Sequence, residues 1–393
     1  MFPIGQAQPA FEEVREIAVL RGGGLGDLLF AMPAIDALAA AYPEARITLL
    51  GTPMAAALLA DRPSSIDAVE VLPVAPGVRE VAGQESDPAE VDAFTARLHG
   101  RFDLAVQVHG GGRNSNPFLL RLGARHTVGT ATEDAEVLER WVRYVYYQHE
   151  VLRALEVAGL AGAAPVVLDP VVHVSDDERA AAVARIEDAI GAPLAGRRVV
   201  AVHPGATDPR RRWPEERFAA VAAARMAQGD VVIVVGDESD REAAITIARS
   251  ATDIAGPDSP GQIVDLAGVL GLGELPGTLA IADVMVADDS GPRHLAVAVG
   301  TRTVGIFWFG NVVNAAPFDR GRHRVEMSFT THCPVCGVDV TQVGWTAERC
   351  EHDPSFVAEV GVEVVLADVA DLLATAPDHA AAVSAAARAT RGG

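Results

Sequence analysis

Short apolar runs bounded by glycine, proline or acidic residues recur along the chain, and most are separated by stretches whose apolar residues have helical spacing. These runs predict strands at residues 15–21, 46–53, 102–112, 197–205, 230–238, 263–268, 283–291 and 303–308. Buried strands that alternate with helices are typical of parallel sheets. The pattern therefore predicts an α/β fold.

The composition changes near the middle of the chain. Residues 161–176 are rich in proline and alanine and poor in long charged side chains, which places a domain boundary near residue 170. We expect two facing Rossmann-like domains with an interdomain cleft, at residues 1–170 and 171–375. An Ala-rich tail follows at 376–393.

The charge and the cysteine content indicate which partners and which cellular location to expect. Acidic residues outnumber basic ones 53 to 32, a formal charge of −21, so nucleic acid and anionic membrane surfaces are poor partners. No apolar run approaches the roughly 20 residues of a membrane span, and the N-terminus lacks a signal-peptide pattern. Only three cysteines occur, all between positions 333 and 350. The cytoplasm is the predicted location.

The first motif, RGGGLGDLLFAMPAI, is a glycine turn that leads into a helix. Gly24 and Gly26 allow backbone N–H groups to approach a ligand closely. A dinucleotide fingerprint would need glycine where Asp27 stands, which argues against an oxidoreductase. Asp27 has two interpretations: a helix cap, or a carboxylate at the strand end that accepts a proton from an incoming hydroxyl.

The second motif, HPGATDPRRRWPEE, carries the basic residues that an anionic ligand needs. Gly205 lies in its small-residue loop, and Arg211 and Arg212 precede a helix start marked by proline and acids. Arginines at this place are suited to hold a pyrophosphate through charge-assisted hydrogen bonds. The alternative is a solvated basic loop.

The third motif, VADDSGPRH, places a strand end at a helix start. Asp289, Ser290 and Gly291 lie where helix N–H groups favour an anion, and His294 follows one turn later. A structural histidine is the alternative for His294. In the first half, the loop HGGGRNSNPF offers His109, Arg113, Asn114 and Asn116 as acceptor contacts, or is an ordinary glycine-rich loop.

These three motifs, in this order, resemble glycosyltransferase family 9, the ADP-heptose:lipopolysaccharide heptosyltransferases, over roughly residues 15–375. The resemblance implies a GT-B fold and a nucleotide-diphosphate sugar donor. It implies that the domain at residues 1–170 binds the acceptor and that the domain at residues 171–375 binds the donor. It implies Asp27 as the general base and Arg211 or Arg212 on the donor phosphates. The remaining implied donor contacts are the box of Asp289, Ser290, Gly291 and His294, with Asp240 and Glu242 as candidates for the ribose.

Two departures from the family pattern change the expected chemistry. Arginine replaces the lysine usual in the basic motif, which leaves that position a purely electrostatic role because arginine does not exchange protons. Pro292 and Arg293 add a charge inside the donor box.

The predicted reaction is inverting, metal-independent transfer of a heptose-like sugar to a glycan or small-molecule hydroxyl. Asp288-Asp289 lacks the D-x-D arrangement of metal-dependent glycosyltransferases. The alternatives are a sugar-nucleotide epimerase or hydrolase on the same fold, and a non-catalytic nucleotide-sugar-binding protein.

A separate cluster of metal-ligand residue types follows near the end of the chain. Cys333, Cys336, Cys350 and His352 supply three thiolates and an imidazole, enough for a tetrahedral structural zinc. The alternative is that the cysteines are reduced and merely packed. No cofactor is expected for catalysis.

Overall fold

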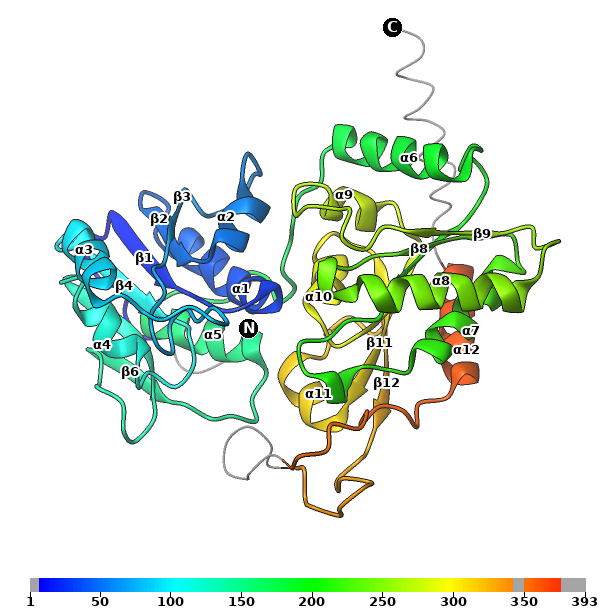
Figure 1. Ribbon diagram of the computed structural model, residues 1–393. Coiled ribbons are helices and arrows are strands. Elements are labelled where there is room, and N and C mark those ends of the chain that lie inside the picture. Colours follow the sequence, from blue (N-terminus) through cyan, green and yellow to red (C-terminus); the bar gives the residue numbers. More distant parts are fainter. Residues whose placement is uncertain (1–6, 342–349, 376–393) are drawn as a thin grey trace, which may run out of the picture. The chain divides into compact units, whose positions relative to one another are not determined.

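The structure is a computed structural model that describes residues 7–341 and 350–375; the predicted Ala-rich tail lies outside them. The chain divides into two compact units, Met1–His173 and Val174–Gly393. Each unit holds one sheet with helices packed against it (Figure 1). Among the helices described, none is both long and apolar enough to cross a membrane.

The first unit is built on a six-stranded parallel sheet. Its strand order is β3-β2-β1-β4-β5-β6. The strands are β1 (Glu16–Leu20), β2 (Arg46–Gly51), β3 (Ala68–Val71), β4 (Leu104–Gln107), β5 (His126–Ala131) and β6 (Arg140–Arg143). The central strands are buried on both faces because helices cover both, as parallel sheets require.

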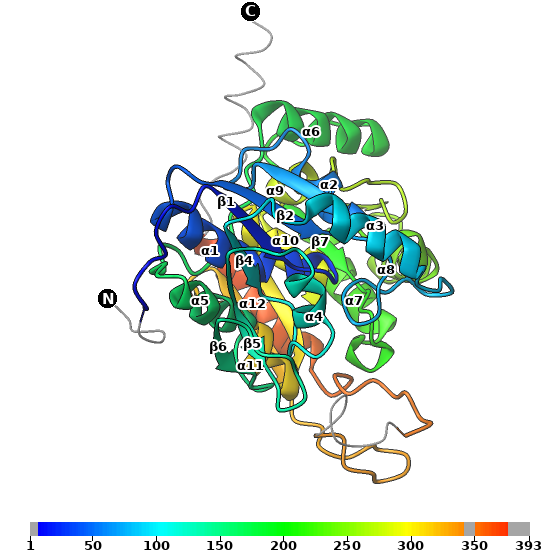
Figure 2. The same cartoon turned by 90° about the vertical axis from the view of Figure 1, so that its left-hand side faces the viewer.

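Helices cover the two faces of this sheet. On one face, α1 (Leu25–Ala41) and α5 (Glu150–Leu160) pack against each other. On the other face, α3 (Pro88–Leu98) and α4 (Ser115–Leu120) contribute Phe94 and Phe118 to a core with Leu20. The short helix α2 (Pro53–Leu59) contacts α1 and β3. Figure 2 shows the same elements from the side.

The second unit repeats this plan. Its strand order is β12-β11-β10-β7-β8-β9, again all parallel, which is the same order read from the other edge. The strands are β7 (Val199–His203), β8 (Val231–Val234), β9 (Gln262–Asp265), β10 (Val284–Asp288), β11 (Arg302–Trp308) and β12 (His323–Ser328). An α/β fold with two parallel sheets is therefore confirmed, as are all eight strands predicted from the apolar runs.

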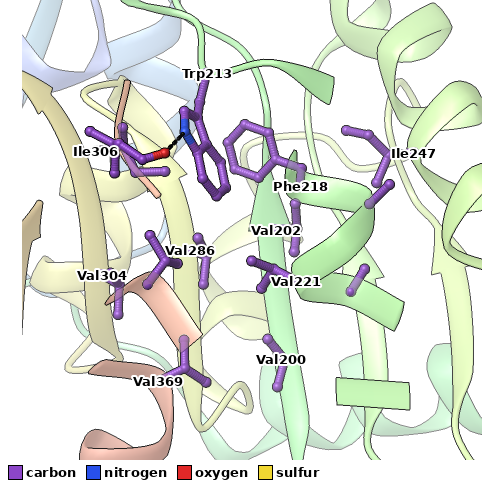
Figure 3. Close-up of a cluster of buried hydrophobic side chains, with 14 of the residues drawn as sticks. Val200, Val202, Trp213, Phe218, Val221, Ile247, Val286, Val304, Ile306 and Val369 are labelled. Atoms are coloured by element: carbon purple, nitrogen blue, oxygen red, sulfur yellow. Dashed lines mark hydrogen bonds between the residues drawn. The ribbon is translucent and has the colours of Figure 1, made fainter. Parts of the chain in front are cut away.

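Alternate strand residues of the second sheet point to opposite helix layers. One face packs against α7 (Glu215–Met226), α8 (Arg241–Ala255) and α12 (Val362–Thr375), with part of this core shown in Figure 3. The helices α6 (Asp176–Ile190), α9 (Leu275–Ala280) and α10 (Gly291–Ala298) pack in sequence with one another. Shorter elements are η1 (Pro209–Arg211), η2 (Glu238–Asp240) and α11 (Phe309–Ala315).

Trp213 anchors the basic loop to this core. Its ring is 1% exposed and meets Phe218 edge to face at 5.0 Å, and its indole nitrogen donates to the carbonyl of Val360 (Figure 3). Burying an aromatic ring of this size contributes about 2–3 kcal/mol. Since Arg211 and Arg212 directly precede Trp213, this burial fixes where the two arginines leave the core.

Both sheets reverse their strand order at one place, between β1 and β4 in the first unit and between β7 and β10 in the second. In open parallel sheets, ligands bind at the carboxyl ends of the strands beside such a switch point. The glycine turn follows β1, and the second and third motifs follow β7 and β10. Each predicted motif therefore lies at the switch point of its own sheet.

Candidate functional site

Asp289 is the centre of the polar cluster in the second unit. It follows β10, and its backbone N–H donates to the carbonyl of Ile306. The buried carboxylate accepts hydrogen bonds from Arg211 Nη1 at 3.1 Å, His294 Nε2 at 3.2 Å and Asn311 Nδ2 at 2.9 Å. The structure thus brings together three predicted residues from two separate motifs and adds Asn311, which the sequence did not suggest.

Asp288 and Asp289 have opposite protonation preferences. Burial alone raises the pKa of Asp289, but the hydrogen bond and charge of His294, with Arg293 and Arg211, outweigh it and lower that pKa to about 2. Burial raises the pKa of Asp288 well above its usual range. Its Oδ1 accepts from the backbone N–H of Trp213 at 3.0 Å, while Oδ2 finds no hydrogen-bond partner in the described part of the chain. The pKa values of the two neighbouring carboxyl groups are therefore shifted in opposite directions.

The three arginines of the basic motif occupy three environments. Arg210 points inward, where it pairs with Asp208 and its guanidinium lies 5.3 Å from the ring centroid of Phe356. Arg211 pairs with Asp289. Arg212 is exposed and donates from Nε to the carbonyl of Ala206 at 2.9 Å. Arg211 and Arg212, the two predicted phosphate ligands, are thus more exposed than Arg210.

A pocket of about 300 Å³ lies beside Arg212. Pro204, Gly205, Trp213 and Asp240 also line it. A Cβ atom on Gly205 would lie 2.1 Å from Oδ1 of Asp240, so only glycine fits there. Glu242 is exposed in the first turn of α8 and does not line the pocket. The ribose roles of Asp240 and Glu242 remain predictions.

Ser290 is the N-cap residue of α10, and Gly291 begins the helix. The Ser290 hydroxyl makes no cap hydrogen bond to the helix and lies instead 3.0 Å from Nδ1 of His203. His203 ends β7 and was not among the predicted site residues. The one feature that could have indicated His203 is its position as the last residue of a strand that borders the switch point.

Arg293 is a second residue whose use the sequence did not reveal. Its side chain is buried, its guanidinium stacks over Phe307 at 4.7 Å, and burial lowers its pKa to about 10. Nη2 lies 2.8 Å from Nδ1 and 3.2 Å from Nε2 of His294, and it donates to the carbonyl of Ala315 at 3.1 Å. Arg293 thus fixes the orientation of His294.

In the first unit, Asp27 lies in the first turn of α1 with both oxygens engaged. Oδ2 accepts from the backbone N–H of Gly24 at 2.8 Å, and Oδ1 accepts from Nη2 of Arg21 at 2.6 Å. The capping arrangement is present, and 45% of the side chain is still exposed. Burial alone lowers the pKa of Arg21, but the charges of Asp27 and Glu150 outweigh it and raise that pKa. The role of Asp27 as a base remains a prediction.

The glycine turn before Asp27 is tightly packed. A Cβ atom on Gly22 would lie 1.9 Å from the carbonyl oxygen of Val78, and Gly23 has a φ of +90°. Gly24 is the N-cap residue of α1, and Gly26 lies within its first turn. The turn therefore needs glycine because its backbone packs closely against the rest of the unit, and the approach of its N–H groups to a ligand remains a prediction.

The four predicted acceptor contacts lie in different settings. His109 is partly buried with Nε2 3.1 Å from the carbonyl oxygen of Gly77, and burial lowers its pKa. Arg113 is exposed and lies 3.5 Å from Asp134, and Asn114 is exposed at the start of α4. Asn116 is fully buried and donates to two backbone carbonyls, so it presents no surface to a ligand in this conformation. Their acceptor roles remain predictions.

The predicted metal ligands do come together. One ligand atom each from Cys333, Cys336, Cys350 and His352 lies within 4.8 Å of the others. Cys333 is buried in the core of the second unit, whereas Cys336 is exposed. Three sulfur atoms and one imidazole at these separations suit a tetrahedral thiolate-binding metal. The donor set therefore fits a metal ion.

Known proteins are similar to this chain in sequence and in fold. The family model described as "Glycosyltransferase family 9 (heptosyltransferase)" matches residues 92–332. Lipooligosaccharide heptosyltransferase 2 of Haemophilus influenzae is 24% identical over 301 residues, which cover 74% of this chain and 82% of the relative.

Two solved structures share the fold. The ADP-heptose lps heptosyltransferase II of E. coli has a TM-score of 0.69 at 18% identity, covering 92% of this chain and 98% of its own. The iron-containing dodecameric glycosyltransferase TibC from enterotoxigenic E. coli has a TM-score of 0.51 at 15% identity. The match covers 93% of this chain and 80% of TibC. These similarities bear out the expected GT-B fold.

Proposed function

The chain belongs to glycosyltransferase family 9, the heptosyltransferase family, and on that basis we propose that it transfers a heptose-like sugar from a nucleotide-diphosphate sugar to a hydroxyl group of a glycan or small molecule. ADP-heptose is the donor to test first, because the E. coli protein of the same fold is described by that donor. The observation that carries the proposal is the cluster around Asp289 at the switch point of the second sheet.

The second unit offers the chemistry that a sugar diphosphate needs. Arg211 and Arg212 supply positive charge next to the start of α10, where Gly291 offers a backbone N–H group. Such groups stabilise the negative charge that develops on the leaving diphosphate as the glycosidic bond breaks. Asp289 holds Arg211 in place, so the guanidinium is positioned before the donor arrives.

Asp27 is the general base in this proposal. It accepts the proton of the acceptor hydroxyl, which attacks the anomeric carbon opposite the diphosphate and inverts its configuration. Arg21 and the N–H of Gly24 fix the orientation of the carboxylate, and its exposed part is free to meet a substrate.

Catalysis is proposed to need no metal at the two adjacent aspartates. The carboxylate of Asp289 is already occupied by Arg211, His294 and Asn311, and Asp288 is fully buried with a raised pKa. A divalent ion would have to displace these partners. The metal that Cys333, Cys336, Cys350 and His352 would hold is structural: a cross-link between the core and the segment that follows β12.

The test combines donor binding with turnover. ADP should raise the melting temperature of the wild-type protein more than GDP, UDP or dTDP do. Asp27→Asn should keep the fold and the ADP response while the transfer of labelled heptose from ADP-heptose to a glycan acceptor falls at least about 100-fold. Asp36→Asn, on the same helix and hydrogen-bonded to Ser65, is the matched control and should retain activity.

Two results would contradict the proposal. If ADP raises the melting temperature no more than GDP, UDP or dTDP do, the assignment of ADP as the nucleotide is wrong. If Asp27→Asn turns over at a near-normal rate, Asp27 is not the general base. Free heptose formed without any acceptor would indicate a hydrolase.

A further inference from the structure

The buried histidine at the end of β7 links two residues of the candidate donor site. His203 is 3% exposed; its Nδ1 lies 3.0 Å from Oγ of Ser290 and its Nε2 lies 3.3 Å from Oδ2 of Asp240. The three residues come from three elements: the end of β7, η2 after β8, and the N-cap of α10. The chain of contacts therefore spans the switch point between β7 and β10.

Asp240 determines which ring nitrogen of His203 carries a hydrogen. Burial alone raises the pKa of Asp240, but the hydrogen bond and charge of His203, with the N–H of Asp237, outweigh it and lower that pKa. An ionised carboxylate only accepts hydrogen bonds. Nε2 of His203 therefore donates to Asp240, and Nδ1 is either bare in the neutral ring or protonated in the imidazolium.

The state of Nδ1 sets the direction of the Ser290 hydroxyl. Beside a neutral ring, Ser290 donates to Nδ1 and presents its oxygen lone pairs outward. Beside an imidazolium, Nδ1–H donates to the Ser290 oxygen, and the hydroxyl hydrogen is free to point at a ligand. The two states therefore present opposite polarity to whatever binds at the start of α10.

The Ser290 hydroxyl is not needed by its own helix. Ser175, the N-cap residue of α6, accepts a hydrogen bond from the backbone N–H of Glu178, whereas Ser290 makes no such bond to α10. Ser290 is thus an N-cap residue whose side chain is held by a histidine rather than by the helix.

We infer that His203 is a positioning residue for the donor diphosphate: as an imidazolium it turns the Ser290 hydroxyl toward a phosphate oxygen, so that donor binding takes up a proton. The inference rests on the proposed function. Phosphate oxygens accept hydrogen bonds, so they favour the state in which Ser290 donates. Asp240 stabilises the buried imidazolium, since a buried cation needs a paired anion.

The surrounding charges leave this pairing intact. Within the described residues, Asp240 of η2 is the ionised group in contact with the ring. Arg212 acts on Asp240 electrostatically from the end of η1. Asp289, next to Ser290, is already paired with Arg211 and His294 and so does not compete for His203.

The experiment measures ADP binding to the full chain by calorimetry between pH 6 and pH 8, in buffers of different ionisation enthalpy. Because ADP itself titrates in this range, proton uptake is compared between variants. His203→Asn should weaken ADP binding about 10-fold or more at pH 6 and take up fewer protons than wild type. Ser290→Ala should weaken it similarly, and the double variant should be no weaker than either single one.

His323→Asn is the matched control. His323 is another buried imidazole whose Nδ1 lies 3.0 Å from a hydroxyl, that of Thr303, but it begins β12, at the opposite end of a strand from the site. This variant should bind ADP and take up protons as wild type does. If His203→Asn does not fold, Asp240→Asn keeps the ring, removes its anion and should also reduce proton uptake.

The outcomes separate this inference from the proposed function. If wild type binds ADP and His203→Asn matches it in affinity and proton uptake, the inference is wrong and the proposed donor stands. The same holds if the losses of ADP affinity caused by His203→Asn and Ser290→Ala add in the double variant. If wild type binds no ADP at millimolar concentration, the proposed donor fails and takes the inference with it.

Discussion

At the scale of single residues, the candidate donor site depends on an adjacent pair of carboxyl groups whose pKa values are shifted in opposite directions. Burial raises the pKa of Asp288, and its Oδ1 accepts from the backbone N–H of Trp213, which fixes the end of the basic loop. Asp289 is charged and holds Arg211 and His294. Burial acts on both groups, and the difference comes from partners: cationic and imidazole groups contact Asp289 directly, whereas Asp288 is bonded to a neutral N–H.

The lowered pKa of Asp289 predicts how stability depends on pH. A carboxyl group whose pKa falls from 3.8 unfolded to about 2 folded stabilises the protein above its unfolded pKa, and this stabilisation disappears as the pH falls toward 2. Asp289→Asn should therefore lower the free energy of unfolding by about 2 kcal/mol at pH 7 and by about half as much at pH 3. Urea unfolding at both pH values measures this difference.

Asp288→Asn provides the comparison. Because burial raises the pKa of Asp288 and so favours its uncharged form, an amide should preserve most of the stability at pH 7. If both variants lose the same stability at pH 7, or if the loss for Asp289→Asn does not shrink at pH 3, the assigned directions of the two pKa shifts are wrong.

At the scale of elements, the motifs that are local in sequence were predictable and the long-range pairings were not. Asp289, Ser290 and His294 lie within six residues and follow a buried strand, so their sequence alone indicated a site. His203 meets Ser290 across 87 residues, and Arg21 meets Glu150 across 129. Pairings of this kind depend on which strands become neighbours, which periodicity does not specify.

The apolar pattern missed four strands, for two physical reasons. Three of them, β3, β6 and β12, lie at sheet edges, where one side is solvated and polar residues are tolerated. Arg140 and Arg143 are the first and last residues of β6, and β12 contains both Arg324 and Glu326. The fourth, β5, is rich in threonine and glycine and so lacks an apolar run.

The cysteine segment after β12 should respond to metal removal. Purified protein should contain about one zinc or iron ion per chain, and Cys336→Ser should abolish this content and lower the melting temperature by several degrees. Elemental analysis and calorimetry measure the two effects. Val335→Ala, a change at an exposed neighbouring residue, should alter neither. If removal of metal does not change the melting temperature of the wild-type protein, the cysteines are merely packed and hold no structural metal.

At the scale of the whole molecule, each unit has its own sheet, core and switch point. The donor cluster and its pocket are made entirely of residues after position 174. A chain of residues 174–393 should therefore fold cooperatively and bind ADP within about tenfold of the full chain, without transferring sugar. Thermal unfolding with and without ADP tests this, and a fragment that folds but ignores ADP would show that the first unit contributes to the nucleotide site.

The repeated strand order also has a genetic consequence. Because both halves carry a complete six-stranded arrangement, a crossover near residue 173 joins whole halves and interrupts no strand. Recombination at that point exchanges the half that carries Asp27 while the half that carries Asp289 is inherited unchanged. Under the proposed roles, in which Asp27 acts on the acceptor and the Asp289 cluster holds the donor, such an exchange would change the acceptor and leave the donor site unchanged.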